Sequence, residues 1–359
     1  MGTMGLPKVK ITFESMGLTA IQRSERGIVL LLLKASTEDE QGSYKFNSLI
    51  DMPEEVKFSE EVAKLIRLGF EAGPRKMLVE VYGEKNPLKD IMNKLKLVKF
   101  NYYAAPNASE EEITQIKSWQ EEEVKEKDRT IKYVGFNYAA DSESVINWTV
   151  PRVVYDKQTY TGQEFTALIA SQLAALPLTR SFTYFSWPLL TDADLPFAED
   201  EDKAVNEGKL FLTFDGEEYK IARGVNSLVT YHARKGEDFS KIKIVEAMHL
   251  IKDDIRDTWN KFYVGKILNT YANKQQFIAL INRVYFAELK NTVLEDSDRN
   301  KVDIDLEACY RYAVKRGAKV DEMTDQQIKE FNTGSNVFLN GYISILDAME
   351  DLYINFWNE

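Results

Sequence analysis

The segment Asn336–Glu359, NVFLNGYISILDAMEDLYINFWNE, is the most informative part of this chain. From Val337 to Ile345 it alternates apolar and polar side chains, which is typical of a β-strand. After Leu346–Asp351 the alternation returns and places three apolar residues on one face: Leu352, Ile354 and Phe356. Chain ends usually fray into polar segments. We therefore expect this strand to pair with a sheet edge, in its own fold or in a neighbouring molecule.

The opposite end of the chain shows the same pattern. The segment Lys8–Glu14 alternates cleanly, with Val9, Ile11 and Phe13 on one face and charged residues on the other. Charged side chains on a short strand are typical of an edge or an added strand. Both ends of the sequence therefore predict strands that need partners.

Between these ends, the first two thirds of the chain read as an α/β layer. The longest apolar run, Ile28–Leu33, predicts a buried strand. Capping boxes at Ser109 and Thr161 each open an amphipathic helix between predicted strands. We also expect a strand at Phe182–Trp187 and a hairpin at 209–222 with an Asp-Gly turn.

Beyond Gly236 the pattern becomes helical. Apolar spacing predicts one long helix at 244–262, a second at Asn273–Val293 and a third at Leu306–Lys315. Thr324 caps a short fourth helix, and the C-terminal strands follow.

Composition excludes several classes of protein. The 359 residues carry a net charge of −11, and no dense Lys/Arg cluster offers a face to nucleic acid. No segment approaches the roughly 20 apolar residues that span a bilayer, so we expect no direct membrane insertion. A single cysteine, Cys309, fits a reducing cytoplasm.

The sequence shows no sign of a catalytic, cofactor or metal site. The two histidines, His232 and His249, have no nucleophile-elbow motif beside them, and zinc, calcium and phosphate-loop patterns are absent. A hydrolase using either histidine remains an alternative, as does a monomeric binding module whose terminal strands close on their own domain. The strands at both ends favour assembly instead, and we expect no enzyme.

Three regions resemble the sheath proteins of contractile phage tails, in the form of the R-type bacteriocin sheaths of Gram-positive bacteria (diffocin-like). The resemblance covers nearly the whole chain, and its segments keep the family's order and spacing. They are 5–13 with 19–27, 247–256 with 263–271, and 333–339 with 346–351.

The resemblance implies a structural subunit with an α/β and α+β, multi-domain tail-sheath fold and extended N- and C-terminal β-strand arms. Such subunits polymerise as stacked six-fold rings around an inner tube, and they contract to drive the tube through a cell envelope. Each arm adds a strand to the sheet of a neighbour. A different structural component of the tail, tube or baseplate, is the alternative.

The resemblance also assigns domains and residues. The domains are an N-terminal arm (1–22), a small α+β domain (23–87), an α/β outer scaffold (88–235), a helical domain facing the tube (236–345) and a C-terminal arm (346–359). The donated strands are those of Val9, Ile11 and Phe13 and of Leu352, Ile354 and Phe356, and the receiving sheet includes Val337–Ile345. The expected hinge is Asp347, Glu350 and Asp351, and the candidates for tube contact are Asp321, Glu322, Asp325 and Glu330.

The implied partners are further sheath subunits, the inner tail tube protein, and the baseplate and terminator or collar proteins, with no cofactor. We expect assembly in the bacterial cytoplasm and release on lysis, as part of a virion or phage-tail-like particle.

Overall fold

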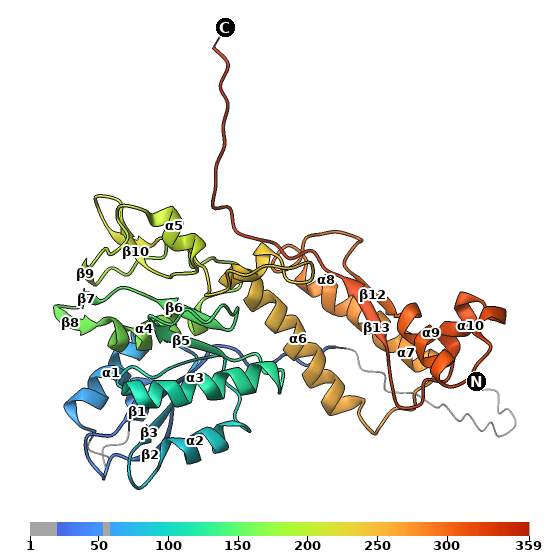
Figure 1. Cartoon of the computed structure of the whole chain (residues 1–359), viewed down its shortest axis with the longest axis horizontal. Helices are drawn as coiled ribbons and strands as arrows, with labels where there is room; N and C mark the ends of the chain where they lie inside the picture. The colour runs from blue at the N-terminus through green and yellow to red at the C-terminus, as the bar shows by residue number, and fades with distance from the viewer. Residues whose placement is uncertain (1–19, 53–57, 359) are drawn as a thin grey trace, which may run out of the picture. The chain divides into compact units, whose positions relative to one another are not determined.

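The computed structural model describes residues 20–52 and 58–358, which divide into two compact units (Figure 1). The α/β unit contains residues 24–253 and the last segment from Ile345. The helical unit contains residues 254–344 and the described residues 20–23. Helix α6 (Ile242–Phe262) begins in the first unit and ends in the second. No helix of the described ranges combines the length and apolarity needed to cross a bilayer.

A six-stranded sheet with the order β2-β3-β1-β4-β5-β6 forms the centre of the α/β unit. Its strands are β1 (Ile28–Lys34), β2 (Gly42–Phe46), β3 (Lys76–Tyr82), β4 (Tyr102–Ala104), β5 (Lys132–Phe136) and β6 (Val145–Trp148). Only β2 runs antiparallel to its neighbour. The whole run Ile28–Leu33 is at most 2% exposed, which confirms the predicted buried strand.

Helices cover both faces of this sheet. Alternate residues of β1 pack with α1 (Glu60–Phe70) and α4 (Gly162–Ala175) on one face. The intervening residues pack with α2 (Leu88–Leu95) and α3 (Glu110–Lys125) on the other. The capping boxes predicted at the starts of α3 and α4 are present. We expected a domain boundary after residue 87, but strands from both sides of it share this one sheet.

The rest of the α/β unit is built from short antiparallel strands. They are β7 (Arg152–Tyr155), β8 (Gln158–Thr161), β9 (Leu190–Ala193), β10 (Leu212–Phe214) and β11 (Tyr219–Ile221). The hairpin β10–β11 was predicted, although its turn spans four residues instead of two. The strand predicted at 182–187 is wrong, because Phe182, Phe185 and Trp187 all turn into one aromatic cluster and so cannot alternate between faces. Short helices complete the unit: η1 (Leu49–Asp51), α5 (Glu201–Asn206) and η2 (Glu237–Ser240).

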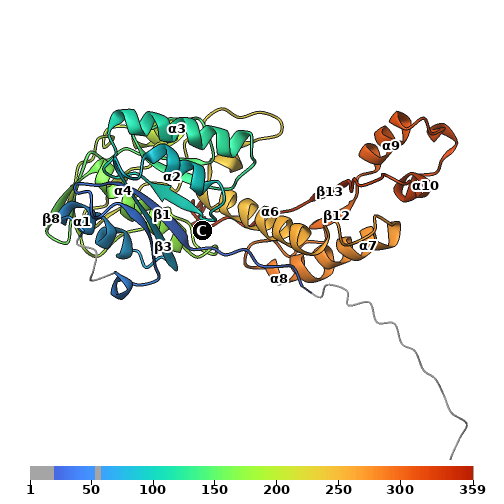
Figure 2. The ribbon, with the colours of Figure 1, turned by 90° about the horizontal axis from the view of Figure 1, so that it is seen from below.

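In its described residues the helical unit combines helices with one two-stranded sheet. Its elements after α6 are α7 (Tyr271–Ala279), α8 (Phe286–Leu289), β12 (Lys301–Ile304), α9 (Leu306–Lys315), η4 (Val320–Glu322), α10 (Asp325–Glu330) and β13 (Leu339–Tyr342). The predicted single helix Asn273–Val293 is interrupted by a π-helical turn, Leu280–Tyr285, and ends at Leu289. Helices α9 and α10 lie side by side (Figure 2). Strand β13 is shorter than the predicted strand Val337–Ile345.

Candidate functional site: the C-terminal arm, its anchor and a sheet edge

The last described residues, 352–358, form an extended arm (Figure 1). Its apolar side chains are exposed. Exposed fractions run from 57% at Ile354 to 92% at Tyr353 and Trp357. The arm belongs to no strand within the described chain. Contiguous exposed apolar surface on a protein usually marks an interaction site. The pairing of this arm with a neighbouring molecule therefore stays a prediction, and the arm's exposure favours it.

Residues 346–351, here called the anchor, hold the root of the arm on the α/β unit. Lys241 Nζ lies 2.6 Å from Asp347 Oδ2, and Lys243 Nζ donates a hydrogen bond to the carbonyl oxygen of Leu346. The hydrogen bond with Asp347 raises the pKa of Lys241. Burial lowers the pKa of Lys243, whose ammonium group is taken out of water by this contact.

Glu350 is the most enclosed acid of the anchor, with a side chain only 12% exposed. Its Oε1 accepts hydrogen bonds from the hydroxyl groups of Ser181 and Thr183, each at 2.7 Å. Arg223 lies beside the same carboxylate, with Nε 3.2 Å from Glu350 and Nη2 2.7 Å from Asp351. The bond with Asp351 is the largest influence that raises the pKa of Arg223. Charge-assisted contacts of this kind are about twice as strong as neutral hydrogen bonds.

The anchor contains all three acids expected as a hinge. Asp347, Glu350 and Asp351 each contact a basic side chain of the α/β unit, so in this structure they hold the root of the arm, and their role as a hinge stays a prediction. Sequence reasoning did not identify the residues that hold the anchor, which are Ser181, Thr183, Arg223, Lys241 and Lys243. Only the acidity of the anchor pointed toward basic partners, and the partners are dispersed along the chain.

The small sheet β12–β13 has two different outer edges. On β12, the side-chain amide of Asn282 bonds both the N–H and the C=O of Val302, each at 2.8 Å. This amide therefore occupies the outer edge of β12 at its middle. Strand β13 has β12 as its one strand neighbour in the described chain, and Tyr342 at its end is 82% exposed. Unpaired edges of this kind are templates for strand addition.

The candidates for tube contact lie close together in the chain and on the surface. Asp321 and Glu322 are in η4, Asp325 and Glu330 are in α10, and all four are exposed. Glu330 accepts a hydrogen bond from Gln326 at 2.6 Å, and Glu322 lies 3.9 Å from Lys319. Their contact with a tube stays a prediction.

The two histidines occupy structural positions. His232 forms a tight turn with Lys235 through two backbone hydrogen bonds. His249 Nδ1 lies 3.2 Å from Nζ of the buried Lys132, which also lies 2.5 Å from Glu246. Burial lowers the pKa of Lys132, and its contacts join β5 to α6. The side chain of His249 is therefore placed by the contacts between β5 and α6.

Comparison with known proteins gives consistent matches. Residues 234–357 match a family model described as the phage tail sheath C-terminal domain. A curated relative, the tail sheath protein of Clostridium phage phiCD119, is 36% identical over 359 residues, covering 98% of each chain. The solved sheath tail protein of Desulfitobacterium hafniense shares the fold with a TM-score of 0.67 at 17% identity, over 83% of this chain and 94% of its own. The contracted helical sheath of the anti-feeding prophage has a TM-score of 0.71 at 12% identity, over 99% and 100%.

Proposed function

We propose a working mechanism for this chain, which belongs to the phage tail sheath protein family and is a subunit of a contractile tail sheath. Its subunits stack as six-fold rings around an inner tail tube, and arms from neighbouring subunits join them by strand donation. The observation that carries this proposal is an apolar arm that is exposed along its length yet held at its root.

Burial of the arm supplies the driving force for assembly. Fully burying a large apolar side chain contributes about 1.5–3 kcal/mol. If Leu352, Ile354 and Phe356 become buried on a neighbour, the gain is about 5–9 kcal/mol before the entropic cost of association is subtracted. Backbone hydrogen bonds to a sheet edge then fix the direction and register of the added strand.

Strand β13 offers the receiving edge. Asn282 already bonds the backbone of Val302 on β12, so a strand added to β12 would have to displace this amide. A strand added to β13 would not. We assign the C-terminal arm of a neighbour to this edge. Residues Val9, Ile11 and Phe13 of the other donated strand lie outside the described residues, and their pairing remains part of the proposal.

Contraction then needs no chemical step. The anchor keeps the root of each arm on its own subunit. We place the rotation of the chain at the C-terminal end of the expected hinge, just after Asp351, where the anchor contacts end. The mesh of arms stays connected while the rings move from an extended lattice to a compact one. The acids that face the tube are Asp321, Glu322, Asp325 and Glu330. Their charge pairs with the tube can break during contraction without exposing a large apolar surface.

The remaining partners follow from this role. The sheath surrounds the tail tube protein and ends at the baseplate and at a terminator or collar protein. It assembles in the bacterial cytoplasm and leaves on lysis, as part of a virion or a phage-tail-like particle.

Deletion of residues 352–359 tests the proposal. The truncated chain should remain folded, because the arm residues removed from the described part are exposed, and it should form no tubes or rings in electron micrographs. Ile50→Ser is the matched control, since Ile50 is 92% exposed and lies far from the arm in sequence. Normal tubes from the truncated chain would refute strand donation by the C-terminal arm.

A further inference from the structure

Strand β13 carries the one Asn-Gly pair of the sequence, Asn340–Gly341. The glycine is required there, because a Cβ on Gly341 would clash with the carbonyl oxygen of Lys301 and with the backbone of Val302 on β12. Glycine also leaves the backbone flexible and its own nitrogen uncovered by a side chain. An asparagine that precedes glycine is therefore the kind whose side-chain amide is most open to attack by the next backbone nitrogen.

The register of β12 and β13 turns the nitrogen of Gly341 away from its partner strand. The N–H of Asp305 donates to the carbonyl oxygen of Phe338, so this pair and every second pair after it exchange backbone bonds. Gly341 lies opposite Val302 in a pair of the other kind, and Asn282 bonds the outward N–H and C=O of Val302. The N–H of Gly341 therefore points to the open edge of β13, where no described residue accepts it.

The side chain of Asn340 is accessible as well. Asn340 is exposed, and its side-chain amide bonds no other residue of the described ranges. Its backbone pairs with Asp303, so a reaction with the next residue requires a brief local opening of β13. Such an opening costs little in this sheet of two strands, because two-stranded sheets are marginally stable by themselves. The exposed amide and the outward nitrogen together define a reactive site.

We propose that Asn340 is a site of spontaneous deamidation, and that the reaction switches off β13 as a receiving edge. Hydroxide removes the proton of the Gly341 nitrogen, which attacks Cγ of Asn340. The new N–Cγ bond closes a cyclic succinimide, and the Cγ–Nδ2 bond breaks to release ammonia, which takes a proton from water. A second water molecule opens the ring at either carbonyl and gives aspartate or isoaspartate. The effect on the edge rests on the proposed strand donation.

Both products weaken the strand. The new carboxylate at position 340 lies directly opposite Asp303, and like charges in opposed positions destabilise a pair of strands. Lys329, with Nζ 2.9 Å from Asp303, offsets this repulsion only in part because it already pairs with that acid. Isoaspartate also adds a carbon atom to the backbone, which moves the residues after it out of register.

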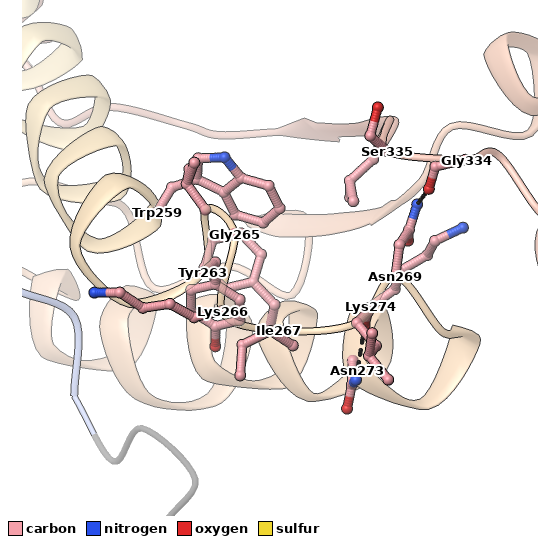
Figure 3. Close-up of a pocket in the computed structure, with 14 residues that line it drawn as sticks. Trp259, Tyr263, Gly265, Lys266, Ile267, Asn269, Asn273, Lys274, Gly334 and Ser335 are labelled. Carbon is pink, nitrogen blue, oxygen red and sulfur yellow. Dashed lines mark hydrogen bonds between the residues drawn. The ribbon is translucent and has the colours of Figure 1, made fainter.

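The strand cannot accommodate this extra atom by sliding. Before β13, Asn269 Nδ2 donates to the carbonyl oxygens of Gly334 and Asn336 at 2.7 and 2.9 Å, and Figure 3 shows the bond with Gly334. After β13, the N–H of Ser344 donates to Asn300 Oδ1 at 2.6 Å. The distortion is therefore confined to β13, which is the receiving edge.

Ageing of the purified full-length chain in mildly alkaline buffer tests the site. Peptide mass spectrometry should detect the replacement of the amide by a carboxyl group at Asn340 before any other asparagine. The comparison includes Asn355, which is exposed but precedes a bulky phenylalanine. An isoaspartyl methyltransferase should label the same peptide, and the label should disappear in Asn340→Gln, whose longer side chain closes the ring far more slowly. Conversion at other asparagines with Asn340 unchanged would overturn the proposal.

Electron micrographs of aged chains test the effect on the edge. The unmodified sequence should lose tubes and rings in proportion to its converted fraction, while aged Asn340→Gln assembles as it did before ageing. Asn340→Asp supplies the charge without the extra backbone atom, and should assemble less well than Asn340→Gln. If fully converted chains form tubes as well as fresh chains, deamidation does not switch off the edge.

A comparison of free and assembled chains separates this proposal from strand donation. In tubes a donated strand on β13 would bond the N–H of Gly341, so conversion of Asn340 should slow at least about tenfold on assembly. Equal rates in both states would reject β13 as the receiving edge and leave Asn340 as a reactive site. Normal tubes from the chain that lacks residues 352–359 would reject donation by the C-terminal arm, with no bearing on the reaction at Asn340.

Discussion

Removal of the Glu350 carboxylate should detach the anchor. In Glu350→Ala the hydroxyl groups of Ser181 and Thr183 lose a charged acceptor at 2.7 Å, and Arg223 loses one of its two carboxylate partners. A hydrogen bond to a charged group contributes about 1.5–3 kcal/mol. Because these contacts share one carboxylate and are not additive, we expect a loss of about 3 kcal/mol, which raises the detached fraction about 100-fold.

Limited proteolysis measures this fraction. Thermolysin cleaves before apolar residues. Met349 is exposed, but the acids on both sides of it, Asp347 and Glu350, are bound to the α/β unit, so this backbone can enter the protease only when the segment detaches. When opening and closing are fast, the rate of cleavage follows the open population. The appearance of a chain ending at Ala348 should therefore accelerate about 100-fold in Glu350→Ala, and less in Glu350→Gln, which keeps an acceptor.

The control is Glu121→Ala, which removes an exposed ion pair with Lys125 that contributes at most about 1 kcal/mol. Its cleavage before Met349 should match the unmodified chain. If Glu350→Ala is also cleaved before Met349 at a rate within about threefold of that of the unmodified chain, the contacts of Glu350 do not hold the arm, and the anchor is refuted.

Two further predictions concern the two units separately. Burial alone would raise the pKa of Glu40, but hydrogen bonds from the backbone N–H groups of Ser59, Thr37 and Ser36 hold it below its usual value. The ionised carboxylate of Glu40 therefore stabilises the fold fully above about pH 4.5, and this stabilisation is lost as the pH falls through the lower folded-state pKa. Glu40→Gln should lower the free energy of unfolding, measured in urea, by about 2 kcal/mol at pH 7 and by much less near pH 3. An equal loss at both pH values would contradict this. In Gly341→Ala the new methyl group would clash with the carbonyl oxygen of Lys301 on the opposite strand, so the variant should lose about 1–3 kcal/mol, while Gly236→Ala, with open space around it, should unfold like the unmodified chain.

Local patterns predicted the elements whose signals lie within a few residues. The apolar run Ile28–Leu33 indicated a buried strand because both faces of a parallel sheet are covered. The capping boxes at Ser109 and Thr161 indicated helix starts because the bonds they need are three residues apart. At Phe182–Trp187 the same reasoning failed, since a cluster of aromatic rings set the backbone path there.

The sequence by itself determined that both ends of the chain carry apolar alternation, that no catalytic motif is present and that an α/β layer precedes helices. These features depend on composition and on spacing along the chain. Only the tertiary structure decided that Ser181, Arg223 and Lys241 meet at the anchor, and that the arm beyond it stays exposed. Such groupings join residues from distant segments, and the fold selects them through burial and charge pairing, which no local pattern records.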